Sequence, residues 1–316
     1  IGCVKKRSLL FTKKMRSNNL GQIDEGLWLL GTKESCVYLL EGSQSSALIS
    51  AGMSYILPDL LRQINDFGIS AGKIEHIIIL HSHFDHVGIV PFLKRKWPRV
   101  KIYASARAWQ ILSNPKAVSL INEYALKVCR RVRGSTDALF LLDWQWRFDV
   151  HGEELGEGSR IDLGNRHIEI HETPGHSSCS ISACVPQLKA LFPSDAVAIP
   201  YRDEYVIAAG SSFRQYEQSL DKLSGLNIEI LCADHYGYVR GEEAKHYITK
   251  SREATQQMID RLLLALREEG SADLAAGKLV KHHFDQRPDY FVDPHILLGT
   301  YTHMLKQFID TGAHSS

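Results

Sequence analysis

The sequence predicts an α/β protein, an αββα sandwich that carries a helical C-terminal extension. Two sets of short β-prone runs with helical segments among them predict the sandwich. The extension is predicted because the pattern after residue 244 is helical almost throughout. A chain of 316 residues with 44% hydrophobic and 23% charged residues can bury a core of that size.

The first β-rich set opens the chain. Short β-prone runs separated by the turn glycines Gly31 and Gly42 are typical of an antiparallel meander. These runs are Leu27 to Leu30, Cys36 to Leu40 and Ala47 to Ser50.

A helix and a buried strand follow the meander. Apolar residues recur at helical intervals between Ile56 and Phe67, and the segment from Ile74 to Leu80 closes with four consecutive apolar residues. That strand leads directly into His81, so a polar cluster lies at a strand's carboxyl end, where α/β folds build their sites.

A helical insert comes next, and we expect it to cover the site. Its elements are helices at Gly88 to Lys94 and Ser105 to Leu112, a strand at Lys101 to Tyr103, and an amphipathic helix at Ala117 to Val132. Arginines at the end of that last helix would meet a phosphate of a CoA-like substrate if the insert lies over the site.

The second β-rich set completes the sandwich. We expect strands at Arg147 to Val150, His167 to His171, Cys179 to Cys184 and Ala190 to Phe192, a helix at Phe213 to Leu223, and a strand at Ile228 to Cys232.

The expected organisation has three parts. Residues 1–15 are interpreted as a disordered or non-native leader, because they are basic and lack the apolar core of a secretory signal. Residues 16–244 form the sandwich domain, and residues 245–316 form the helical extension that packs on it.

Composition excludes two classes of partner. The net charge of +1 provides no global basic field for nucleic acid or an anionic membrane. The apolar runs are far shorter than the roughly 20 residues that a membrane-spanning helix needs.

Six scattered cysteines without CxxC pairs indicate reduced core thiols, which favours the cytoplasm.

The segment from His81 to Gly88 carries the strongest chemical signal. It places three imidazoles and one carboxylate within six residues, in ligand types suited to zinc, iron or manganese. In an extended turn, His81 and His83 point at one metal while Asp85 and His86 can reach a second. A surface histidine patch or an adventitious metal site is the alternative interpretation of this cluster taken alone.

Three further candidate ligands each follow an expected strand. His176 stands at the tip of a Pro-Gly turn, Asp195 follows Ala190 to Phe192, and His235 follows the strand that ends at Cys232. A carboxylate between two cations, with histidines on either side, forms a recurring hydrolytic site.

With these residues the sequence resembles the metallo-β-lactamase superfamily. The HxHxDH loop, the later GH, the bridging Asp and the final His match His81 to His86, Gly175-His176, Asp195 and His235. The resemblance spans roughly residues 20 to 245 and implies the αββα fold and two divalent metal ions, with zinc, iron and manganese as candidates. It also implies the ligand sets: His81, His83 and His176 on one metal, Asp85, His86 and His235 on the other, and Asp195 bridging them.

Two residues distinguish this chain from other branches of the superfamily and so disfavour the reactions of those branches. Asp195 stands where drug-degrading β-lactamases have Cys, and His83 stands where the flavodiiron branch has Glu. A looser resemblance, to the aminobenzoylacetyl-CoA thioesterase branch of quinolone-signal response proteins, rests on Gly21-Gln22, on His81 to Leu93, and on the helical insert and tail.

Two departures from the superfamily pattern concern ligand support. The chain has Ser50-Ala51-Gly52 where Asp-Thr-Gly is common, so a supporting carboxylate is missing there. Asp234, in place of a glycine, precedes His235, and it either supports a ligand or caps a turn.

The expected activity is metal-dependent hydrolysis of a small-molecule ester or thioester, with an acyl-CoA-like thioester as first choice. A metal-bridging hydroxide attacks the acyl carbon, and Asp85 or metal-bound solvent handles the proton. Lactone or other ester hydrolysis and phosphodiester cleavage are the alternatives. An alternative of another class is a regulatory protein whose C-terminal helices bind a partner or form a homodimer.

Overall fold

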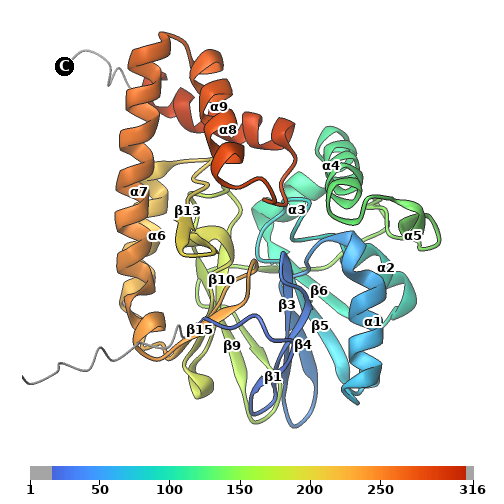
Figure 1. The fold of residues 1–316 in the computed structure, drawn as a ribbon. Helices are drawn as coiled ribbons and strands as arrows, with labels where there is room; N and C mark the ends of the chain where they lie inside the picture. Colours follow the sequence, from blue (N-terminus) through green and yellow to red (C-terminus); the bar gives the residue numbers. More distant parts are fainter. Residues whose placement is uncertain (1–15, 311–316) are drawn as a thin grey trace, which may run out of the picture.

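The computed structural model describes residues 16–310, and the expected leader at residues 1–15 lies outside this range. Two β-sheets face each other in the middle of the molecule, and helices cover the outer face of each (Figure 1). The αββα arrangement predicted from the sequence is therefore confirmed.

The first sheet has seven strands in chain order. They are β1 (Gly21–Asp24), β2 (Leu27–Thr32), β3 (Ser35–Glu41), β4 (Ser46–Ile49), β5 (Ile74–Ile78), β6 (Lys101–Ser105) and β7 (Glu153–Leu155). Strands β1 to β4 pair antiparallel, which confirms the expected meander, and β4 to β7 pair parallel.

The second sheet has six strands in the order β15-β14-β11-β10-β9-β8. They are β8 (Arg160–Asp162), β9 (His167–Glu172), β10 (Ile181–Val185), β11 (Ala190–Phe192), β14 (Ile230–Cys232) and β15 (Tyr238–Arg240). A separate hairpin is formed by β12 (Ile199–Tyr201) and β13 (Glu204–Val206).

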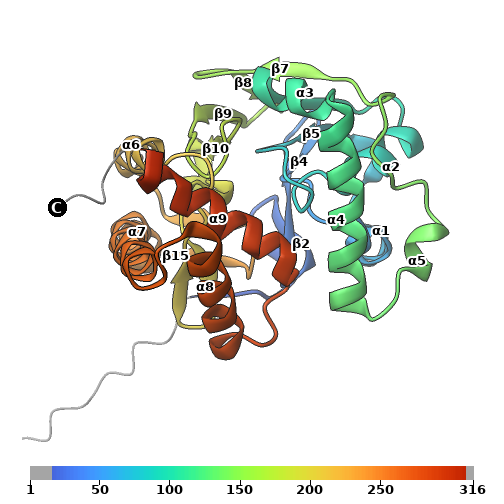
Figure 2. The ribbon, with the colours of Figure 1, turned by 90° about the horizontal axis from the view of Figure 1, so that it is seen from above.

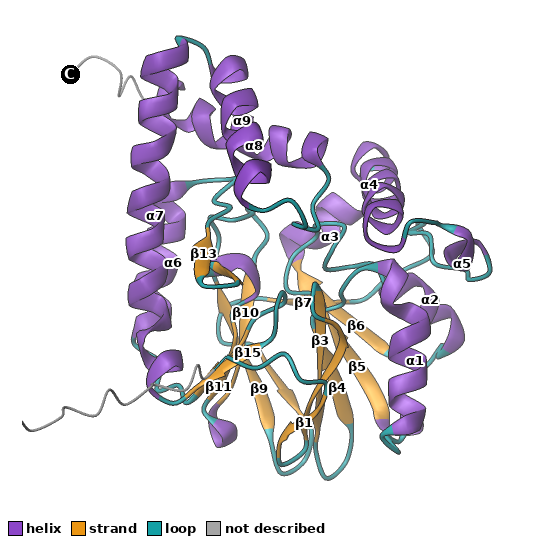
Figure 3. Cartoon of the chain, in the orientation of Figure 1, coloured by secondary structure: helices purple, strands orange, loops and turns teal. Residues whose placement is uncertain are grey.

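The helices fall into four groups (Figure 3). Helices α1 (Leu57–Asp66) and α2 (Val90–Lys96) cover the first sheet, and α6 (Phe213–Ser224) and α7 (Glu242–Glu269) cover the second. The insert contributes α3 (Ala106–Leu112), α4 (Pro115–Arg133) and α5 (Asp137–Phe140), and the extension ends in α8 (Ala272–Gln286) and α9 (Pro294–Asp310). Short 3₁₀ turns lie at Ser54–Ile56, Ala71–Lys73, Pro186–Leu188 and Ser194–Ala196.

The faces of the two sheets enclose the central core. Tyr38 of β3 and Phe192 of β11 are fully buried there, with their rings 5.3 Å apart in an edge-to-face arrangement. Separate apolar clusters lie between each sheet and its helices. Ile77 to Leu80, at the end of β5 and just after it, are fully buried, which explains why this run is apolar at four consecutive positions instead of alternating.

One expected strand is wrong. The segment from Arg147 to Val150 contains a turn at residues 148–149 and belongs to neither sheet, and Phe148 is 54% exposed. The Arg95 side chain holds this region by two hydrogen bonds of 2.8 Å to the Asp149 carboxylate and by bonds to the Asp143 and Gln145 carbonyls. The strands near this part of the chain are β7 and β8, which were not predicted.

The insert and the extension lie over the same edge of the two sheets, with α4 on one side and α9 on the other (Figure 2). Arg131 near the end of α4 connects them: its guanidinium donates to the backbone carbonyls of Tyr290 and Pro288 and lies over the Phe284 ring. The insert therefore does cover the edge where the strands end, as expected.

The structure can be compared with two expectations from the sequence, that the cysteines are core thiols and that no helix spans a membrane. Cys36, Cys129, Cys179, Cys184 and Cys232 are all buried free thiols, and Cys3 lies outside the described residues. Among residues 16–310, no helix is long and apolar enough to cross a membrane.

The loop after β5 lies directly on the backbone of residues 52–54, and Gly88 permits this approach. A Cβ atom at Gly88 would come within 2.2 Å of the Ser54 backbone nitrogen, and the Gly88 N–H donates to the Gly52 carbonyl at 2.7 Å. We predict that Gly88→Ala lowers the free energy of unfolding by about 1–3 kcal/mol through overpacking, measured by urea denaturation.

The matched control is Gly72→Ala, because a Cβ at Gly72 meets no atom within 4 Å. It should leave stability unchanged or raise it by about 0.4–1 kcal/mol. Equal effects of the two substitutions would show that the close backbone contact at Gly88 is unimportant.

Candidate metal centre

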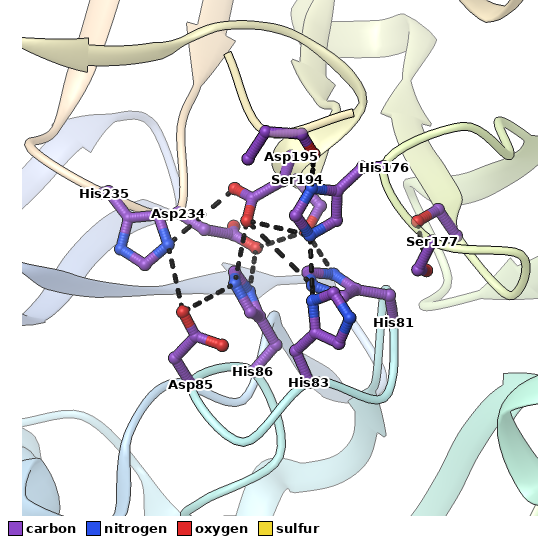
Figure 4. A network of polar contacts seen from close by, with 12 residues as sticks. His81, His83, Asp85, His86, His176, Ser177, Ser194, Asp195, Asp234 and His235 are labelled. Atoms are coloured by element: carbon purple, nitrogen blue, oxygen red, sulfur yellow. Dashed lines mark hydrogen bonds and ion pairs between the residues drawn. The ribbon is translucent and has the colours of Figure 1, made fainter. Parts of the chain in front are cut away.

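Four loops at one edge of the sandwich bring all seven predicted ligand residues together (Figure 4). The loop after β5 carries His81 to His86, and the turn after β9 carries His176. The 3₁₀ turn after β11 carries Asp195, and the loop after β14 carries His235. The prediction that each group of candidates follows a strand is confirmed.

Three imidazoles form the first group. His83 Nδ1 lies 3.1 Å from His81 Nε2 and 2.9 Å from His176 Nε2. Nitrogens bound tetrahedrally to one zinc ion at about 2.0–2.1 Å would lie about 3.3 Å apart. The spacing of the three nitrogens therefore fits a shared cation.

The second group contains Asp85, His86 and His235. Asp85 Oδ2 lies 3.6 Å from His86 Nε2 and 3.7 Å from His235 Nε2. Both of these nitrogens are buried and have no hydrogen-bond partner among the described residues. Unpaired buried nitrogens that face a carboxylate at this distance fit a cation between them.

Asp195 stands between the two groups. Its Oδ2 lies 3.2 Å from His86 Nε2, 3.5 Å from His176 Nε2 and 4.0 Å from His81 Nε2. Its Oδ1 lies 3.7 Å from His235 Nε2. The carboxylate therefore faces both groups at once, as the bridging role implied by the resemblance requires.

The outer nitrogens orient three of the imidazoles. His86 Nδ1 donates to Asp234 Oδ2 at 2.8 Å, His235 Nδ1 donates to the Glu34 carbonyl at 2.6 Å, and His176 Nδ1 donates to the Ala208 carbonyl. Because these oxygens can only accept, each neutral ring must carry its hydrogen on Nδ1. The Nε2 lone pairs then point inward, toward the space between the groups.

Asp234 holds two of the candidate ligands, so of the two roles left open by the sequence the structure favours the supporting one. Besides accepting from His86, its Oδ2 accepts a hydrogen bond of 2.7 Å from Ser194 Oγ. Ser194 Oγ in turn accepts from His81 Nδ1 at 3.0 Å. One buried carboxylate thus connects an imidazole from each group.

Sequence reasoning missed Ser194, because nothing local marks a serine whose partners lie on two distant loops. Ser50, which replaces the common aspartate, is fully buried with its Oγ unpaired. Ser50 therefore offers no hydrogen bond to a candidate ligand, whereas Asp234 is a buried carboxylate bonded to His86.

Charge within the site favours bound cations. Burial lowers the pKa of His81 well below its ordinary value and lowers that of His176 to about 4, so both rings are neutral at pH 7. Burial also opposes charge on His86 and His235, but the carboxylates of Asp85 and Asp195 raise the pKa of each ring above its ordinary value. Positive charge at these two Nε2 atoms is therefore favoured.

A cavity of about 480 Å³ opens directly on the centre. His83, Asp85, His176 and Asp195 form part of its wall, and most of the remaining wall is apolar. The described residues that line it include no lysine, arginine or glutamate.

The insert arginines do not line this cavity. Arg131 holds the segment before α9, and Arg133 pairs with Asp59 and lies over the Tyr55 ring. The expectation that one of them meets a substrate phosphate is not supported for these two, since both side chains have structural partners.

Comparisons with known proteins agree with this geometry. The family model described as the metallo-beta-lactamase superfamily matches residues 31–235. A metallo-beta-lactamase fold-containing protein of Sulfurisphaera tokodaii is 24% identical over 71% of this chain and 82% of its own. The acyl-coenzyme A thioesterase MBLAC2 of Gallus gallus is 26% identical over 76% of this chain and 87% of its own.

Solved structures give the same fold. A metallo-beta-lactamase family protein from Thermus thermophilus superimposes with a TM-score of 0.66 at 16% identity, covering 92% of this chain and 96% of that one. The family model spans the HxHxDH loop and the three later ligand positions. The chain belongs to the metallo-β-lactamase superfamily of metal-dependent hydrolases.

Proposed function

We propose that this protein is a dinuclear metal-dependent thioesterase that cleaves acyl thioesters, of which acyl-CoA is the model substrate. The observation that carries the proposal is a largely apolar cavity whose wall includes His83, Asp85, His176 and Asp195 but no lysine or arginine side chain. A substrate that fills this cavity presents an uncharged acyl group to the proposed metal ligands.

The ligand assignment follows the two groups. His81, His83 and His176 would hold one cation, Asp85, His86 and His235 would hold the other, and Asp195 would serve both. Support comes from the converging nitrogen atoms of the first group and from the unpaired buried Nε2 atoms of His86 and His235. Imidazole and carboxylate ligands suit zinc, iron and manganese alike.

The protein residues have distinct tasks in the reaction. When bound, the two cations supply Lewis-acid polarisation and a water of lowered pKa. Asp85 lines the cavity beside the reacting group and is the carboxylate that accepts the proton from the attacking water. The apolar wall excludes bulk water, which strengthens electrostatic stabilisation within the site.

Thioesters are favoured over the other candidates for two reasons. Away from the candidate ligands the cavity wall is apolar and has no lysine or arginine, which suits the uncharged acyl part of a thioester better than charged groups that flank a phosphodiester. A thiolate with a pKa of about 8.5 leaves readily, so no separate general acid is required. Lactones and oxygen esters fit the same apolar wall and remain the second candidates.

In the alternative function, that of a regulatory protein, the helices of the C-terminal extension bind a partner. Helix α9 contributes Ile296, Leu297 and Met304 to the cavity wall, so this helix has a role in the proposed active site. Partner binding or dimerisation through the extension stays a prediction.

Metal content is the first test. Protein purified without chelators should contain about two divalent metals per chain by elemental mass spectrometry and should hydrolyse acyl-CoA. We expect His83→Ala and Asp195→Ala to lose metal and hydrolysis together, because each removes a ligand.

The control is His151→Ala, which removes an exposed histidine outside the centre and should change neither quantity. Metal-loaded protein that leaves every thioester intact but cleaves lactones or phosphodiesters would overturn the thioesterase assignment. Failure to bind metal under any loading condition would overturn the hydrolase proposal.

A second prediction concerns Asp234. Asp234→Asn removes the negative charge that holds His86 and, through Ser194, His81. We expect metal affinity to fall by about 10–100-fold while the fold persists, measured by competition with a chromophoric chelator. Asp285→Asn, at an exposed position of α8, serves as the matched control. Equal affinities in the two variants would refute the supporting role.

A further inference from the structure

Helix α4 presents an apolar stripe to the cavity. Ala117, Leu120, Ile121 and Tyr124 line it, and their spacing of three, four and seven residues places them on one helix face. The stripe follows the helix for roughly 10 Å, given a rise of about 1.5 Å per residue.

Helix α9 presents the opposite wall with the same spacing. Ile296, Gly299, Thr300 and His303 line the cavity and run for roughly 10 Å along the helix. The view from above shows α4 and α9 on either side of the space over the sheet edge (Figure 2). We call the part of the cavity between these two stripes the acyl slot.

The acyl slot begins at the candidate metal centre. The Tyr124 ring meets the ring of Phe84, which lies within the HxHxDH loop, at 5.8 Å. On the other side Phe291, just before α9, stacks on the His235 imidazole with ring centres 4.8 Å apart. The far end is open, because Leu120 is 45% exposed and His303 is also exposed.

The slot contains no carboxylate, lysine or arginine, and its imidazole, His303, lies at the exposed far end. The carboxylates that line the whole cavity are Asp85 and Asp195, both at the centre, and no lysine, arginine or glutamate lines it in the described chain. A charged group on the chain of an occupant would lose its hydration there without a partner, at a high cost in free energy.

We propose that the acyl slot binds the uncharged alkyl chain of a fatty acyl group, and that the gap between α4 and α9 sets the specificity for chain length. This inference rests on the proposed thioesterase function and adds the substrate class. With C–C bonds of about 1.5 Å, a slot of roughly 10 Å accommodates about eight carbons in extended form.

Chain length should therefore control the rate. We expect kcat/KM for saturated acyl-CoA substrates to rise about two- to fourfold for each added methylene group up to about eight to ten carbons. Longer chains should give a plateau, because the far end of the slot is open to solvent. Acyl groups with a terminal carboxylate should react at least about tenfold more slowly than their methyl-ended counterparts.

Gly299 gives a direct test of the slot. A Cβ there meets no atom within 4 Å, so Gly299→Leu places its side chain in the open space of the slot without a backbone clash. Relative to its own rate with acetyl-CoA, the variant should lose the rate gain beyond about four to six carbons.

Gly277→Leu is the matched control. Gly277 also lies within a helix, its Cβ position is equally open, and it is exposed on α8 outside the cavity. Both substitutions replace a helical glycine and should stabilise the helix to a similar degree. Only the Gly299 variant should change the chain-length profile.

Binding of decanoate and of acetate, measured by calorimetry on the intact protein, separates this inference from the proposed function. Tight decanoate binding that Gly299→Leu weakens and Gly277→Leu does not would support the slot even if no thioester were cleaved. Thioester hydrolysis with rates independent of chain length, or a Gly299→Leu profile identical to the control, would overturn the slot while leaving the thioesterase assignment intact.

Discussion

The orientation of three buried imidazoles is the constraint on which the site depends. His86, His176 and His235 each donate their Nδ1 hydrogen to an oxygen that can only accept, which leaves the Nε2 lone pairs directed inward. No local segment could arrange this alone, because the accepting oxygens belong to loops far away in sequence. The two facing sheets, whose strands end at one edge, supply those loops.

The centre and the acyl slot come from different parts of the architecture. The centre lies at the strand ends that the superfamily model covers, whereas α9 lies beyond residue 235, where that match ends. The insert and the extension are joined across the site by Arg131. The hydrolytic centre is thereby combined with a wall from the insert and a wall from the extension, and in our account these walls select the substrate.

The candidate centre could be predicted from sequence because its signals are local: four polar residues follow one apolar strand, and three more residues each follow another. The role of Asp234 could not be decided, since its partner His86 is 148 residues away. An amphipathic helix reveals an apolar face without revealing what covers it, so the position of α9 against α4 needed the structure. The segment from Arg147 to Val150 was wrongly expected to be a strand, and the Arg95 side chain that bonds it lies 54 residues earlier, where a local pattern does not reveal it.

The central claim is that two cations lie between these loops with Asp195 bridging them. Anomalous X-ray diffraction at the absorption edge of the metal found by elemental analysis tests this most directly. The account predicts two peaks about 3.5–4 Å apart, one beside His81, His83 and His176 and the other beside Asp85, His86 and His235. A single peak, or two peaks outside these groups, would contradict it.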